Sequence, residues 1–116
     1  ARAEPFAGLR RLELAGHRIG PAGAAAAADP RRLPRLDAIG LANNALAGRA
    51  AAGDLLTRPV IDLSANGFEP ADLQALLDAP GPAAVRDLDL GENPLHDAAG
   101  RLIAASPRLA GLRTLR

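Results

Sequence analysis

The sequence predicts an α/β solenoid, in which a curved parallel sheet forms the concave face and helices form the convex face. Two observations lead to this prediction. One hydrophobic pattern returns along the chain at nearly constant spacing, and each copy changes from a strand pattern to a helix pattern. Strands that are joined by crossover helices run in the same direction and form a parallel sheet. The chain is therefore predicted to be a single segment of such repeats, residues 1–116.

The repeat has four full copies, which start near residues 9, 36, 58 and 85, and a partial copy that starts at residue 112. One apolar position of the pattern is filled in succession by Leu12, Ile39, Ile61, Leu88 and Leu115. The spacings between these residues are 27, 22, 27 and 27. The second copy is thus shorter than the others, which predicts a reduced or single-turn helix on its convex side.

The strands are predicted where apolar and polar residues alternate. Residues 12–14, 61–63 and 88–90 each place one polar residue between two apolar ones, as in Leu12-Glu13-Leu14. A period of two residues indicates a strand with one buried face.

Helices are expected after the strands. Pro70 stands where a first helical turn would begin, a position that tolerates the missing N–H of proline. Asp97 occupies the equivalent place in the fourth copy, where its charge suits a helix N-terminus. Leu73, Leu76 and Leu77 have the spacing of a helical stripe that packs inward. The helix that begins near Pro70 is therefore expected to pack inward through these leucines.

The third copy begins with an unusual pair, Arg58-Pro59. Arg58 occupies a position where other copies have leucine or valine, so we expect its aliphatic stem to cover the core while its guanidinium reaches water. Pro59 has no N–H to donate to a sheet ladder, so it is tolerated only at the beginning of the strand, outside the ladder.

The pattern L-x-x-L-x-L-x-x-N-x-L resembles the leucine-rich repeat family, and the 27-residue spacing is most similar to its ribonuclease-inhibitor-like subtype. The resemblance covers nearly the whole chain. It implies a horseshoe arc, and members of this family commonly serve as protein recognition platforms. The alanine-rich, lysine-free composition is typical of a GC-rich bacterial genome.

Composition argues against several functions. Cysteine is absent, which removes disulfides and thiolate zinc sites, and all 14 basic residues are arginine, which removes lysine nucleophiles and the P-loop lysine. A formal net charge of +1 predicts no strong attraction to nucleic acid. The sequence has neither a long apolar run nor a signal-peptide pattern, so we predict no membrane span and a cytoplasmic location.

One polar position is filled by His17, Asn44, Asn66 and Asn93 in the four copies. These residues could form a row that binds a ligand. The favoured interpretation is a structural ladder, in which each buried carboxamide bonds backbone groups that have left the sheet, because unpaired buried amides are costly. His17 can replace only part of this bonding, so the first rung should be the weakest.

Neither a metal site nor a catalytic site is predicted. His17 and His96 lie about three rungs apart at roughly 4.8 Å per rung, without carboxylates at helical spacing to complete a metal site. The hydroxyl residues stand in repeat consensus or loops, and none is paired with a suitably placed histidine; they are Thr57, Ser64, Ser106 and Thr114. We therefore predict no enzymatic activity and no cofactor.

The concave face is the expected site for a protein partner. Asp62 and Asp89 fall in one column on neighbouring rungs, and an arginine or lysine of a partner would relieve their repulsion. The predicted binding residues are Arg11, Glu13, Asp62, Asp87, Asp89, Glu92 and Arg113. Alternatively, an aspartate between two leucines only keeps this face soluble. The chain would then be a structural or regulatory spacer of a larger protein, with no partner of its own.

Neither end of the repeat carries a polar capping unit, which solenoids need for solubility. The leucines of the terminal strands would therefore face unpaired edges; they are Leu9, Leu12 and Leu14 at one end, and Leu112 and Leu115 at the other. Exposed edges of a sheet invite pairing with another chain. We expect either end-to-end self-association or a chain that is a fragment of a longer array.

Overall fold

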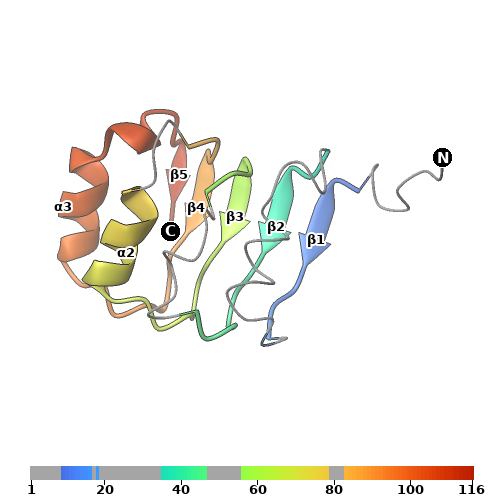
Figure 1. Ribbon diagram of the computed structural model, residues 1–116, viewed down its shortest axis with the longest axis horizontal. Helices are drawn as coiled ribbons and strands as arrows, with labels where there is room; N and C mark the ends of the chain where they lie inside the picture. Colours follow the sequence, from blue (N-terminus) through green and yellow to red (C-terminus); the bar gives the residue numbers. More distant parts are fainter. Residues whose placement is uncertain (1–8, 17, 19–34, 47–55, 79–82) are drawn as a thin grey trace.

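A computed structural model shows an α/β fold with one five-stranded parallel sheet (Figure 1). It describes residues 9–16, 18, 35–46, 56–78 and 83–116. Within these residues the elements are β1 (Arg11–Glu13), β2 (Ala38–Gly40), β3 (Val60–Asp62), α2 (Pro70–Leu77), β4 (Asp87–Asp89), α3 (Ala98–Ala105), the 3-10 turn η2 (Pro107–Leu109) and β5 (Thr114–Leu115). The strands lie in chain order across the sheet. The predicted parallel sheet is thus confirmed.

The register of the sheet follows the sequence repeat. Leu12 pairs with Ile39, Ile39 with Ile61, Ile61 with Leu88, and Leu88 with Leu115. These five residues form the column from which the spacings were measured. Equivalent residues of successive copies therefore lie side by side, including across the short second copy.

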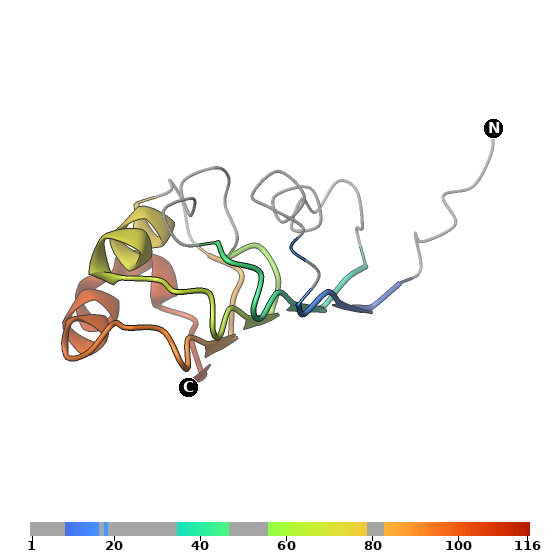
Figure 2. The ribbon, with the colours of Figure 1, turned by 90° about the horizontal axis from the view of Figure 1, so that it is seen from below.

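Both helices lie on the same side of the sheet, and Figure 2 shows them above one end of it. α2 begins at Pro70, where the backbone N–H of Glu69 donates to the Asp72 carboxylate at 2.9 Å. α3 begins directly after Asp97, so both predicted starts are confirmed. The convex walls predicted for the first two copies fall outside the described residues.

The core lies between the sheet and the helices, and it is complete only in the central rungs. The predicted stripe of α2 is buried there. It packs with buried apolar residues of the central copies, namely Leu36, Ile39, Leu41, Leu46, Leu56, Ile61, Leu63, Phe68, Val85, Leu88, Leu90, Leu95 and Leu109. Leu9, Leu12, Leu14 and Leu112 are only partly buried, and they lie in or beside β1 and β5, the outermost strands of the described sheet.

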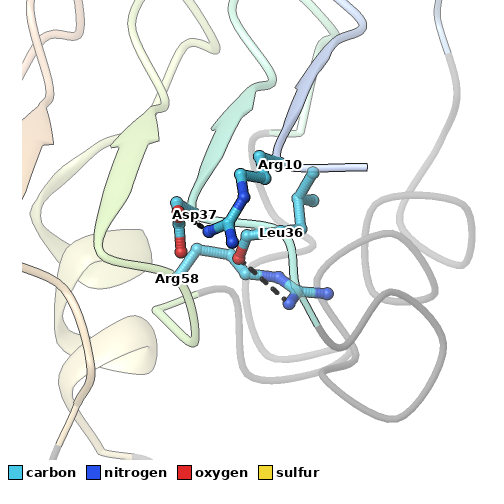
Figure 3. Close-up of polar contacts among 4 residues, drawn as sticks. All are labelled: Arg10, Leu36, Asp37 and Arg58. Atoms are coloured by element: carbon cyan, nitrogen blue, oxygen red, sulfur yellow. Dashed lines mark hydrogen bonds and ion pairs between the residues drawn. The ribbon is translucent and has the colours of Figure 1, made fainter. Parts of the chain in front are cut away.

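Arg58 departs from the prediction. Its side chain is 2% exposed, and Nη1 donates to the backbone carbonyl oxygen of Leu36 at 3.3 Å (Figure 3). The expectation that its guanidinium reaches water is therefore wrong, because a carbonyl of the preceding rung supplies an acceptor in the interior. The nearby ion pair between Arg10 and Asp37 is exposed on both sides, so it contributes little to stability. Pro59 directly precedes β3, as predicted.

In the turns that follow β2 and β3, the residues before and after the ladder asparagine (Asn44 or Asn66) have left-handed backbone conformations. Asn43 and Ala45 have φ of 57° and 55°, and Ala65 and Gly67 have φ of 55° and 73°. Only glycine adopts this region without a steric cost. The two alanines therefore carry strain that the ladder and the sheet maintain.

Replacing Ala65 with glycine is expected to raise the free energy of unfolding by up to about 1 kcal/mol, since relief of left-handed strain exceeds the entropy cost of glycine. Urea denaturation measures the change. Ala75→Gly in the interior of α2 is the control, and it should lower stability by about 1 kcal/mol. Equal losses in the two variants would contradict the strain argument.

Candidate functional site

The side of the sheet opposite the helices, here called the open face, carries a groove of about 260 Å³ that crosses all five strands. Alternate residues of each strand point to opposite faces, so the first and third positions supply the open face. These positions and the residue after β5 are Arg11, Glu13, Ala38, Gly40, Val60, Asp62, Asp87, Asp89, Thr114 and Arg116, and all of them line the groove.

The structure brings together five of the seven predicted binding residues: Arg11, Glu13, Asp62, Asp87 and Asp89 line the groove. The other two do not line it. Glu92 lies in the turn beyond β4, with a φ of 56°, and borders a separate hollow at the edge of the sheet. Arg113 is exposed and directly precedes β5. The sequence pattern put these two residues on the face because it does not locate the strand ends.

Two aspartates of the open face also have a structural role. Asp62 Oδ1 accepts hydrogen bonds from the backbone N–H and the hydroxyl of Ser64, at 2.9 and 2.6 Å. Asp89 Oδ1 accepts the N–H of Gly91 at 2.9 Å. In each case the carboxylate satisfies the backbone donor that comes two residues later, where the chain leaves the strand. The sequence signal is an acidic residue followed at the second position by a small one.

Glu13 extends this acidic column across β2. Its Oε1 accepts the backbone N–H of Ala15 at 3.0 Å. A Cβ atom placed on Gly40 would collide with the Glu13 carboxylate, so this carboxylate lies over the second strand. The missing side chain of Gly40 makes that position possible. Carboxylates therefore follow one another over β2, β3 and β4, whose strands are spaced at roughly 4.8 Å.

Asp87 differs from these three residues. Among the described residues its side chain makes no hydrogen bond, although it is partly buried. It pairs in register with Val60, which is 38% exposed. The centre of the groove thus combines apolar surface with a carboxylate that is not engaged by the backbone. This pairing matches a side chain that has both an aliphatic stem and a positive charge.

The asparagine ladder lies inside the molecule and not in the groove. Asn66 Nδ2 donates to the carbonyl oxygens of Leu41, Leu63 and Ser64 at 3.0–3.2 Å. Its Oδ1 accepts the backbone N–H of Asn44 at 2.9 Å. Asn93 Oδ1 in turn accepts the N–H of Asn66 at 2.9 Å, so the carboxamides link neighbouring rungs. His17, the first position of this row, falls outside the described residues.

The described part of the chain contains no cluster of three histidine, cysteine or carboxylate side chains that could hold a metal ion. His96 is exposed in the turn before α3 and does not line the groove. Ser64 uses its hydroxyl to bond Asp62. Among the described residues, no helix has the length and apolar composition that crossing a bilayer requires.

Comparison of the sequence with models of known protein families and with curated proteins finds no match. An assignment of function therefore depends on the chemistry of the open face. Its acidic column, its exposed valine and its length across five strands are the features that a partner would meet.

Proposed function

We propose that the chain is a leucine-rich repeat solenoid that binds a protein partner on its open face, the concave side of the arc. The groove that crosses all five strands, with carboxylates over its central strands, carries this proposal. The in-register alignment of equivalent residues supports the solenoid, because each copy adds the same strand to the same sheet. No reaction is proposed for this face, which acts by recognition alone.

The charges of the groove favour an extended segment with a central arginine or lysine. Asp62, Asp87 and Asp89 attract a cation at the middle strands, whereas Arg11 and Arg116 repel one at the two ends. Complementary charges of this kind set the register of a partner more than its total affinity. The exposed side chain of Val60 would pack against the aliphatic stem of the bound residue.

Asp87 also separates this proposal from the alternative, a spacer that binds nothing. The hydrogen bonds of Asp62 and Asp89 to backbone N–H groups favour a structural role for these two carboxylates. Asp87 has no such bond among the described residues. The need to satisfy backbone groups at the end of a strand therefore does not explain why this position is acidic. A partner's cation gives this carboxylate a function that the fold does not.

The test is selection of binders from a displayed library of random peptides against the immobilised chain. Binders should carry a central arginine or lysine, and Asp87→Asn should weaken them by about tenfold, or 1.4 kcal/mol, as measured by titration calorimetry. Raised salt should weaken binding further.

Asp97→Asn is the matched control, because Asp97 is exposed at the start of α3, away from the groove. It removes the same charge and should leave the affinity unchanged. A selection without basic binders, or equal affinities for the two variants, would support the spacer instead.

A further inference from the structure

The two outermost strands of the described sheet, β1 and β5, carry apolar side chains that are less buried than their equivalents in the inner strands. In the column of paired apolar residues, Ile39, Ile61 and Leu88 are 2%, 1% and 2% exposed. Leu115 at one edge is 44% exposed, and Leu12 at the other is partly buried. Within the described residues, β1 and β5 are the outermost strands of the sheet, so neither edge residue has a described rung on its outer side. Leu115 also borders a hollow of about 330 Å³ lined by Leu90, Leu95, Ala99 and Ile103 among others.

The backbones of β1 and β5 also carry N–H and C=O groups that point away from the sheet and could bond to each other. In a parallel ladder, the N–H and C=O of one residue bond the two residues that flank its partner. Leu88 follows this rule, since its carbonyl oxygen accepts the N–H of Arg116 at 2.9 Å. By the same alternation, the N–H and C=O of Leu115 face away from the sheet, and those of Arg11 and Glu13 face away at β1.

We propose that β5 of one copy of this chain pairs with β1 of a second copy, in parallel and with Leu115 in register with Leu12. The Leu115 carbonyl oxygen would then accept the Glu13 N–H, as the Leu88 carbonyl accepts that of Arg116. Leu12 and Leu14 of the second copy would cover the hollow beside Leu115. The repeat makes this register possible, because both residues occupy the same position of the pattern.

Charge supports a second copy as the occupant. In the proposed register, Arg116 of one copy lies beside Glu13 of the next, and Thr114 lies beside Arg11. The Glu13–Arg116 pair would add a positive residue to the acidic column of the open face. Two different surfaces meet, so the contact is heterologous and joins copies head to tail, into a ring where the rotation between copies closes and into an open chain where it does not.

Sedimentation equilibrium of the full chain tests this pairing. The unmodified chain should show an average mass that rises with concentration above that of the monomer, to a fixed multiple for a ring and without a limit for an open chain. Leu115→Pro removes the outward N–H and no hydrogen bond within the chain, so this variant should remain monomeric with an unchanged circular dichroism spectrum. Leu115→Val retains the N–H and should associate like the unmodified chain. An unmodified chain that stays monomeric, or a proline variant that associates equally, would overturn the proposal.

A charge exchange tests the register. Arg116→Glu should weaken association by about tenfold, and Glu13→Arg should do the same. The double variant reverses the pair and should recover most of the association. Failure of the double variant to recover, while both single variants remain folded by circular dichroism, would overturn the proposed register. None of these outcomes depends on peptide binding, so they are independent of the proposed function.

Discussion

Replacing Asn66 with alanine is expected to lower the free energy of unfolding by about 3–5 kcal/mol, because five hydrogen bonds between its carboxamide and the backbone of two rungs would be lost. The side chain donates to three carbonyl oxygens from two rungs. It also accepts the backbone N–H groups of Asn44 and Leu46, at 2.9 and 3.3 Å. At 2% exposure, the site is closed to the water that could replace these bonds.

Urea denaturation followed by circular dichroism measures this loss. Asn66→Asp is the informative companion at neutral pH, because a carboxylate still accepts from Asn44 and Leu46 but cannot donate to the carbonyls. It should therefore be at least as unstable as the alanine variant. Asn93→Ala, at a partly exposed rung, should cost less. If Asn66→Ala costs under about 1 kcal/mol, the ladder does not hold the rungs together.

The sequence predicted the parts of this molecule that follow from local pattern. The spacing of Leu12, Ile39 and Ile61 is enough to predict the register, because a repeat stacks equivalent residues. The stripe of Leu73, Leu76 and Leu77 is likewise local, since helical periodicity alone places these residues on one face. The charged column of the open face followed from strand alternation.

Features that depend on a neighbouring rung were not predictable. Arg58 is buried because the Leu36 carbonyl, one copy earlier, lies within reach, and no local pattern carries that distance. Glu13 crosses to β2 because Gly40 leaves space there, which only the register reveals. The sequence pattern places Glu92 on the binding face, because it does not mark where β4 ends and the following turn begins.

Replacing Phe68 with alanine is the second change with a large expected effect, a loss of about 3–5 kcal/mol in the free energy of unfolding. Phe68 is fully buried in the core, and its backbone N–H donates to Asn93 Oδ1 at 2.9 Å. This bond holds the backbone of Phe68 to the ladder. Close-packed interiors relax only partially around a truncated side chain, so alanine would leave a cavity here.

Phe68→Leu separates the cavity from the loss of an aromatic ring. Leu46 and Leu95 occupy the equivalent position in the neighbouring copies and are buried at 1% and 4% exposure, so this place in the fold already accepts leucine. The leucine variant should cost only about 1–1.5 kcal/mol, whereas Leu115→Ala at the exposed edge should cost less than Phe68→Ala by several fold. Comparable losses for leucine and alanine at position 68 would show that the ring is required, and that the copies are not interchangeable in their packing.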